Sequence, residues 1–179
     1  MSSLKAFLPQ LADVIGTTPA ALYERQRALV RQGVLHPLVG RGPGSGVELS
    51  ADAVAALLIS VGAAWSLSEV DSRIIKYCQA QSATGKCLLT NQKKLRGALA
   101  VILTDPNLLG RVASITVHHD YPLAAIDYRR EDGKTELSLF GNAAKRLPGS
   151  GFKICSQIMH QLLSETSNLL RETNREGTS

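Results

Sequence analysis

The sequence predicts an α+β fold that is mostly helical, with about three antiparallel strands and flanking helices. Apolar residues recur at helical spacing in most segments up to Leu103, and they alternate with polar residues between Val112 and Phe140. The first pattern is typical of amphipathic helices and the second of half-buried strands. With 44% hydrophobic and 20% charged residues, the chain can bury a core and is not expected to be disordered.

Two helices joined by a short turn are predicted at the start of the chain. The first spans Leu4–Ile15 and ends at Gly16. A threonine cap at Thr18 begins the second, because the proline that follows fits the first helical position. This second helix runs to about Gln32, where Gly33 can adopt a left-handed C-cap.

A glycine-rich hairpin and a third helix are expected next. Val34–Val39 and Val47–Leu49 look extended, and residues 40–46 between them contain four glycines, which favour a turn. Ser50 is predicted to cap a helix that runs to about Trp65.

The rest of the chain is expected to form a second domain. Its predicted elements are helices over Ser68–Gln81 and Asn91–Leu103, a turn at Asp105–Asn107, strands over Val112–His118, Leu123–Arg129 and Thr135–Phe140, and a final helix from Phe152 to about Glu172. We therefore expect a domain at residues 1–66, a second at 67–172 and a flexible tail at 173–179.

The second helix is the strongest candidate functional element. Projected at about 100° per residue, one face holds Leu22, Gln26, Leu29 and Val30, and the opposite face holds Ala20, Glu24, Arg27, Ala28 and Arg31. A helix that enters the major groove needs small residues for close approach and Arg or Glu side chains that reach bases or phosphates. The order helix, turn, helix, hairpin, helix is that of a winged helix-turn-helix.

These features predict a sequence-specific DNA-binding transcription regulator, either an activator or a repressor. Helix 18–32 would read the major groove of double-stranded DNA, and the wing at 40–46 would contact the backbone or the minor groove. Backbone N–H groups at the start of the helix suit a phosphate. The predicted DNA-contacting residues are Thr17, Thr18, Ala20, Glu24, Arg27, Arg31, Arg41, Ser45, Lys93 and Lys94.

Three segments resemble MerR-type winged-helix regulators. Leu11–Pro19 resembles their first helix and turn, Ser50–Leu57 the helix after the wing, and Ser66–Val70 the start of the next helix. The resemblance covers about residues 5–80 and implies a DNA-binding domain. The family's paired aromatics in the second helix, its Gly-Tyr-Arg wing segment and its long dimerisation helix are absent. The wing region is also reminiscent of regulators from bacterial prophage-like elements.

Positive charge is concentrated outside the proposed DNA-binding domain. The net charge is +5, of which residues 1–66 carry +1 and residues 67–111 carry +4. DNA binding must therefore depend on where charges are placed and not on bulk charge. Lys93, Lys94 and Arg96 fall at the start of a predicted helix, where they form either a solvated face or a contact to flanking phosphate.

No enzyme, cofactor or metal site is predicted. The three cysteines form no C-x-x-C pair, which indicates free thiols in a reducing compartment, and neither a signal peptide nor a membrane span is expected, so we place the protein in the bacterial cytoplasm at the nucleoid. Ser82–Cys87 contains Gly-Lys but lacks the other residues of a phosphate loop. His118 and His119 are adjacent on a strand and face opposite ways.

The role of the second domain is left open by the sequence. Ile154, Ile158, Leu162 and Leu169 form an apolar stripe on the predicted final helix, which favours a homodimer interface or a domain core. The domain could also bind an effector, RNA polymerase or another DNA-binding protein. The alternative function is a protein-interaction adaptor, in which both the winged helix and the sheet bind other proteins.

Overall fold

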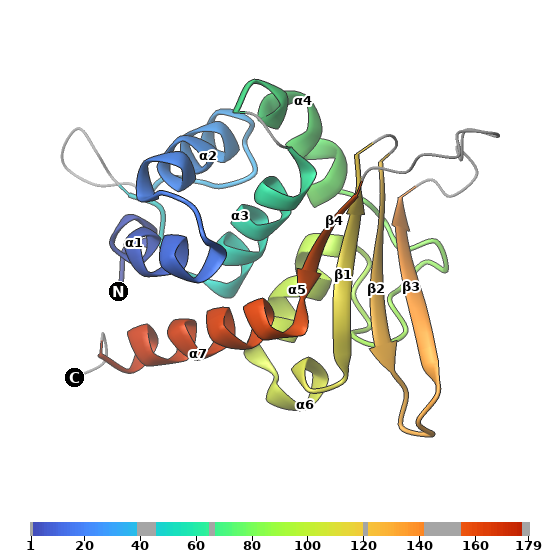
Figure 1. Cartoon of the computed structure of the whole chain (residues 1–179). Coiled ribbons are helices and arrows are strands. Elements are labelled where there is room, and N and C mark those ends of the chain that lie inside the picture. Colours follow the sequence, from blue (N-terminus) through green and yellow to red (C-terminus); the bar gives the residue numbers. More distant parts are fainter. Residues whose placement is uncertain (1, 39–45, 65–66, 120–121, 142–154, 177–179) are drawn as a thin grey trace.

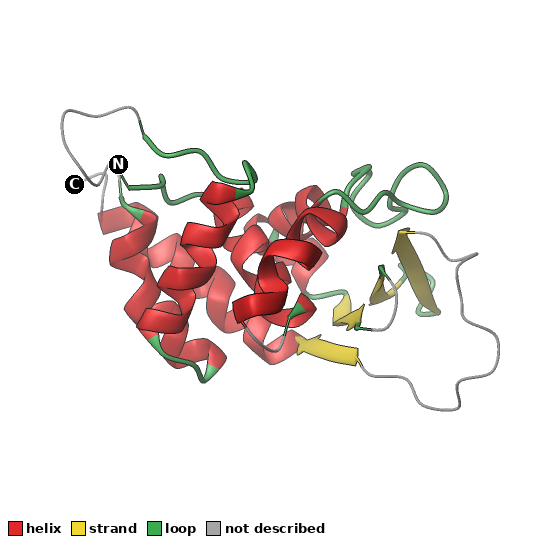
Figure 2. Cartoon of the chain, turned by 90° about the horizontal axis from the view of Figure 1, so that it is seen from above, coloured by secondary structure: helices red, strands yellow, loops and turns green. Residues whose placement is uncertain are grey.

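A computed structural model describes residues 2–38, 46–64, 67–119, 122–141 and 155–176. The predicted α+β class is confirmed, with helices in excess of strands. The helices are α1 (Leu4–Ile15), α2 (Pro19–Arg31), α3 (Ala51–Ala63), α4 (Leu67–Cys78), α5 (Leu95–Thr104), α6 (Pro106–Leu109) and α7 (His160–Glu176). In Figures 1 and 2 the helices lie on one side of a single sheet.

The sheet is antiparallel throughout, with the strand order β3-β2-β1-β4. Its strands are β1 (Val112–His118), β2 (Leu123–Arg129), β3 (Thr135–Gly141) and β4 (Cys155–Met159). The three predicted strands are confirmed, and β3 is one residue longer than expected. Ile115, Ile126 and Phe140 are fully buried on the face that packs against the helices.

The predicted final helix from Phe152 to Glu172 is wrong in its first part. Cys155–Met159 forms β4, which pairs with β1 so that Ile158 lies opposite Ile115, and the helix begins only at His160. Ile158 is therefore a core residue of the chain itself and no part of a helical stripe. The apolar spacing fitted a helix, but pairing with β1 decides the backbone conformation of these five residues. Ile154 lies outside the described residues.

Three smaller predictions also differ from the structure. The helix expected from Asn91 begins at Leu95, because Asn91 has a left-handed φ of 58° and the Lys93 carbonyl accepts a hydrogen bond from Ser82 N–H. The turn expected at Asp105 is the cap of the four-residue helix α6, where the carboxylate accepts from the N–H groups of Asn107 and Leu108. At the other end of the chain, α7 continues to Glu176, within the segment expected to be a tail.

The predicted caps of the first helices are confirmed. Gly16 has a φ of 75° after α1, Thr18 Oγ1 accepts a hydrogen bond from Ala21 N–H at 3.2 Å, and Gly33 has a φ of 67° after α2. The expected hairpin pairs at one bridge, between Pro37 and Val47. Whether this order of elements forms a winged helix-turn-helix stays a prediction, since residues 39–45 at its tip lie outside the described residues.

Helix α3 connects the two halves of the molecule. It contacts α2 and α4 on one side and α5, β1 and β4 on the other, and its residues from Ala53 to Ser60 are all buried. Gly62 lies where this helix packs on the sheet, since a Cβ there would be 3.4 Å from Val117 Cγ2. One hydrophobic core thus runs from Leu4 to Leu170, across the expected domain boundary at residue 66.

Arg25 links α2 to the end of α3 through hydrogen bonds. Its guanidinium is buried, with 9% of the residue exposed, and donates hydrogen bonds to the carbonyls of Ser60 (2.5 Å) and Ala64 (2.9 Å). These carbonyls belong to the last turn and the C-cap of α3, which have no further helical partner and carry the negative end of the helix dipole. Burial lowers the pKa of Arg25 by removing water from the guanidinium.

No helix in the described ranges is long and apolar enough to cross a membrane.

We predict that Arg25→Met lowers the free energy of unfolding by about 2–5 kcal/mol, because it leaves the two buried carbonyls without a donor. The control is Arg27→Met on the exposed face of the same helix, which should cost less than about 1 kcal/mol. Urea unfolding followed by circular dichroism measures both. Similar losses in the two variants would contradict a structural role for the Arg25 hydrogen bonds.

Candidate nucleic-acid interface

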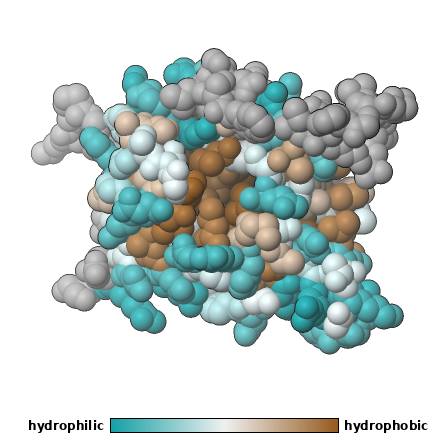
Figure 3. Space-filling model, in the orientation of Figure 1, coloured by the Kyte–Doolittle hydropathy of each residue, from teal (hydrophilic) through white to brown (hydrophobic). Residues whose placement is uncertain are grey.

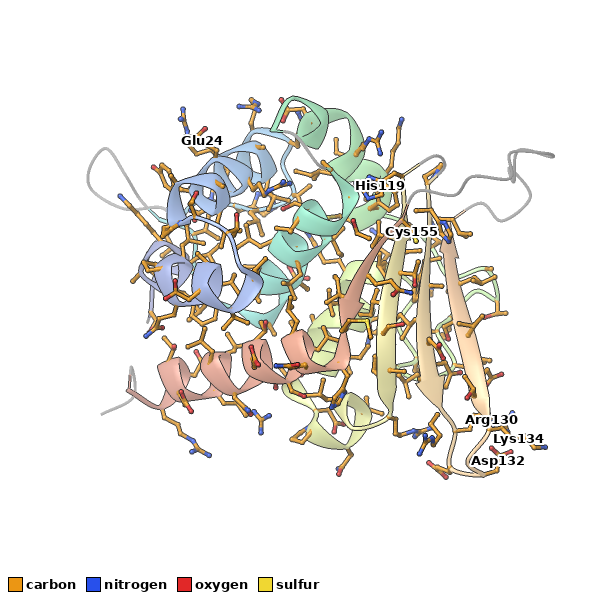
Figure 4. The ribbon with its side chains drawn as sticks, viewed as in Figure 1. Glu24, His119, Arg130, Asp132, Lys134 and Cys155 are labelled. Carbon is orange, nitrogen blue, oxygen red and sulfur yellow. The ribbon has the colours of Figure 1, made fainter. Side chains whose placement is uncertain are left out.

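One side of α2 faces solvent and carries four of the ten predicted DNA-contacting residues. Ala20, Glu24, Arg27 and Arg31 are all exposed, and Figure 4 shows Glu24 on the side of α2 that faces away from the other helices. On the opposite side, Leu22, Gln26 and Leu29 are buried and Val30 is half-buried, as predicted. Ala28, which was placed on the outer face, is buried with 4% exposed.

The start of α2 offers fewer free donors than expected. Thr17 N–H donates to the Ala12 carbonyl at 2.9 Å, so this group is already used to end α1. The Thr18 hydroxyl is also used, as the acceptor of the N-cap hydrogen bond. A phosphate at this helix start would therefore bind the remaining N–H groups of the first turn, with Thr17 half-buried and Thr18 exposed beside it.

Both predicted recognition arginines are engaged in exposed ion pairs. Arg27 lies 3.1 Å from Glu24 on the same helix, and Arg31 lies 2.5 Å from Asp71 on α4. The arginine side chains are 60% and 58% exposed, respectively, so solvent reaches both pairs. Each guanidinium is thereby held at the surface of α2 in a defined position, and each would have to exchange a carboxylate for a base or a phosphate on binding DNA.

Two residues beside these pairs were missed by the sequence analysis. Tyr23 is 37% exposed on the same strip of α2, and the Lys5 ammonium of α1 lies 5.3 Å from the centre of its ring. Both could have been identified from the sequence. Tyr23 is three residues after Ala20 and about one helical turn before Arg27, which places it on the same face of α2, and Lys5 is the only basic residue of α1. Asp71 carries no such signal, because its partner is 40 residues away in the sequence.

One basic residue of the second half, Arg96, contacts the first half of the chain. Arg96 donates to the Val34 carbonyl at 2.8 Å and pairs with Asp52 at 3.0 Å, so it ties the start of α5 to the segments before and after the hairpin. Lys93 and Lys94 precede it and are exposed, in a loop and not in a helix as predicted. Arg41 and Ser45, the predicted wing contacts, lie outside the described residues.

Nucleophilic and metal-ligating side chains are dispersed in the described part of the chain, which contains no group of three His, Cys, Asp or Glu residues that could hold a metal ion. Cys78 and Cys87 are buried, and burial raises the pKa of Cys78 to about 12. His119, near the upper end of β1 in Figure 4, shares a hydrogen bond of 2.8 Å with Ser156 Oγ on the neighbouring strand.

No protein-family model, curated protein or solved structure matches this chain. The functional argument therefore depends on the residues of the surface described above.

We predict that Asp71→Asn changes the free energy of unfolding by less than about 1 kcal/mol, because the Arg31–Asp71 pair is exposed and solvent screens it. Urea unfolding of the wild type, Asp71→Asn, Arg31→Ala and the double variant gives the coupling between the two side chains. A coupling above about 2 kcal/mol would mean that the pair is needed to hold α4 against α2.

Proposed function

We propose that this chain is a sequence-specific DNA-binding transcription regulator, in which α2 lies in the major groove and residues 40–46 form a wing that contacts the DNA backbone or minor groove. The proposal names double-stranded DNA as the partner. It retains the homodimer as an expectation, because one such module reads only a few base pairs.

The observation that carries the proposal is the exposed strip of α2. The capped helix, which Arg25 holds from its buried side, presents Ala20 in its first turn and Tyr23, Arg27 and Arg31 along the turns that follow. A small residue at the start of the helix allows this end to approach base edges, and the guanidinium groups of the following turns could reach guanine or phosphate. The following bridge between Pro37 and Val47 positions the base of the proposed wing after this helix.

The carboxylates on this strip support a role in selectivity. Glu24 and Asp71 hold Arg27 and Arg31 when no DNA is bound, and both carboxylates would repel a nearby phosphate. Non-specific affinity, which comes from phosphate contacts, is lowered by this repulsion. A base pair that accepts hydrogen bonds from the arginine and donates one from cytosine to Glu24 would compensate for this repulsion. Affinity for that sequence would then exceed the affinity for others.

A protein-interaction adaptor is the second candidate function, and the same ion pairs favour it. The four side chains of Glu24, Arg27, Arg31 and Asp71 together carry no net charge. A surface of mixed charge like this one can bind a partner protein whose charges are complementary to it. Salt dependence distinguishes the two functions. Affinity for DNA should fall steeply as salt rises, because released counterions drive binding.

We predict that Arg27→Ala and Arg31→Ala each weaken binding to the preferred DNA sequence by about 1–3 kcal/mol and reduce discrimination between sequences. The preferred sequence is first obtained by sequencing genomic fragments retained by the protein. Fluorescence anisotropy with that duplex then gives the affinities. Arg130→Ala serves as the control, since Figure 4 places this exposed arginine at the β2–β3 turn, far from α2. Unchanged binding in both α2 variants would remove α2 from the interface.

We predict that Asp71→Asn has the opposite sign to Arg31→Ala. It releases Arg31 and removes a negative charge from the surface, so affinity for DNA should rise several-fold, most clearly at low salt and for non-specific duplexes. Titration of specific and non-specific duplexes at several salt concentrations checks this. Weaker binding by Asp71→Asn would show that the ion pair is needed to orient Arg31 for its contact.

We predict that Arg41→Ala lowers affinity for specific and non-specific DNA alike and reduces the slope of log affinity against log salt by about one unit, as expected for the loss of one phosphate contact. The same titrations measure it. A loss of discrimination with non-specific affinity preserved would contradict a backbone contact by this residue.

A further inference from the structure

We propose that a hollow beside the start of β1 and the end of β2 binds a free α-amino acid, whose carboxylate pairs with Arg129 and whose ammonium pairs with Asp127. This ligand site goes beyond the proposed function and does not depend on it. The tests below use no DNA, so their failure would leave the proposed DNA binding untouched.

The hollow lies at the end of the sheet where β2 turns into β3. Its volume is about 340 Å³, within the range of sites for small molecules. The residues that line it all belong to the described ranges and are 110–113, 127–131, Thr135 and His160. Figure 4 labels Arg130, Asp132 and Lys134 at this corner of the molecule, and Figure 3 shows mainly hydrophilic surface there. A ligand at this place would therefore be polar.

Two oppositely charged side chains in the hollow have no partner among the described residues. Asp127 and Arg129 are two positions apart on β2, so they lie on the same face of the sheet, opposite to the face of the core residues Ile126 and Tyr128. Asp127 is half-buried, and its Oδ1 is enclosed without a hydrogen bond. Arg129 is exposed, and its side chain forms no hydrogen bond or ion pair in the described part of the chain. The hollow thus offers one anion and one cation to a ligand.

A neighbouring hollow provides the contrast. It has a volume of about 500 Å³ and is lined by the alternate residues of β2, Tyr128 and Arg130. Arg130 lies 3.6 Å from Asp132 and 3.7 Å from Glu136, and the Tyr128 hydroxyl donates to Glu136 at 3.0 Å. These polar groups already have partners within the chain. The unpaired charges are therefore a property of the first hollow and not of the whole corner.

The backbone that carries Arg129 is held in place by Arg111. The Arg129 N–H donates to the Arg111 carbonyl at 2.8 Å, and Arg111 Nε donates back to the Arg129 carbonyl at 3.0 Å. Arg111 also lies 3.4 Å from Glu131, so its charge is partly neutralised. Arg129 is then the cation that remains for a ligand, on a backbone that is ordered before the ligand arrives.

A β-bulge in β1 makes room beside these side chains. The register with β2 shifts between Val112 and Ser114, so the intervening Ala113 has no partner on β2, and its small side chain lies exposed at the hollow. His160 lines another side. Its Nδ1 donates to the Val112 carbonyl at 2.9 Å, since a carbonyl only accepts, and its Nε2 lies 3.2 Å from Ser164 Oγ. Bulges of this kind are common beside functional sites.

An α-amino acid satisfies both unpaired side chains with one small molecule. Its carboxylate accepts two N–H groups of a guanidinium, and its ammonium donates to a carboxylate. Both groups are bonded to one carbon, and residues two apart on a strand are separated by only about 7 Å, so a single molecule can contact Asp127 and Arg129 together. A simple anion would be repelled by Asp127, and a simple amine would be repelled by Arg129.

The first test is thermal unfolding of the full chain with each of the common α-amino acids. We expect at least one of them to raise the midpoint at about 10 mM, because a ligand that binds only the folded state stabilises it. Isothermal titration calorimetry then gives its dissociation constant, which we expect to be below about 1 mM. The same compound without its amino group, or without its carboxyl group, should bind about tenfold more weakly or worse, because it loses one charge-assisted contact.

The second test assigns the two contacts. Asp127→Asn and Arg129→Met should each raise the dissociation constant of the amino acid by about tenfold or more. Asp127→Asn should not weaken binding of the compound without the amino group, a result that a merely structural role for Asp127 would not produce. Lys134→Met is the control, since Lys134 is exposed at the β2–β3 turn outside the hollow, and it should bind like the wild type. Circular dichroism establishes that each variant is folded.

Three results would each overturn the inference. The first is a wild type that binds no α-amino acid with a dissociation constant below about 10 mM. The second is a compound without the amino group that binds as tightly as the amino acid itself. The third is equal affinity of the Asp127→Asn, Arg129→Met and Lys134→Met variants for the amino acid.

Discussion

The position of α2 depends on the burial of one cation at the end of α3. Arg25 satisfies two carbonyls of α3 at the point where that helix ends, and a buried guanidinium without these acceptors would be strongly destabilising. The constraint acts in both directions. The end of α3 obtains donors that no later residue of the helix can supply, and α2 is fixed in rotation about its own axis. The exposed strip of α2 is therefore determined by an interaction on its buried side.

The ion pairs on that strip have a different character. Glu24 and Asp71 contribute little to the stability of the fold, since exposed pairs are screened by water and restrict two long side chains. Their effect is on the arginines, which are kept extended over the surface and partly neutralised. If the proposed function is correct, the protein needs low affinity for the many non-specific sites of a genome as much as high affinity for one, and carboxylates beside Arg27 and Arg31 would lower the non-specific affinity.

Local chemistry made much of the fold predictable. The limits of α1 and α2 could be predicted from Gly16, Thr18 and Gly33. The alternation from Val112 to Phe140 predicted three strands, two with the bounds seen in the structure and the third one residue too short. Properties set by distant partners could not be found in this way. Cys155–Met159 is a strand because β1 offers an edge, and Asn91–Lys94 leaves the helix because Lys93 accepts from Ser82. In the candidate site, the exposed face of α2 was predicted and its partner Asp71 was not. Arg25 occupied the inward spacing between Leu22 and Leu29 but was not assigned a role, because a charged residue there becomes meaningful only when the end of α3 is placed behind it.

The packing of α3 against both α2 and the sheet has a consequence for the length of the DNA target that the proposed function implies. One hydrophobic core joins α2 to the sheet through α3 in the described part of the chain. In the proposed homodimer, the distance between the two α2 helices would then be set by the packing of the fold. The two half-sites of an operator would have to match that distance and lie on the same side of the duplex, a whole number of turns of about 10 base pairs apart. Inserting half a turn between them would carry one half-site out of reach.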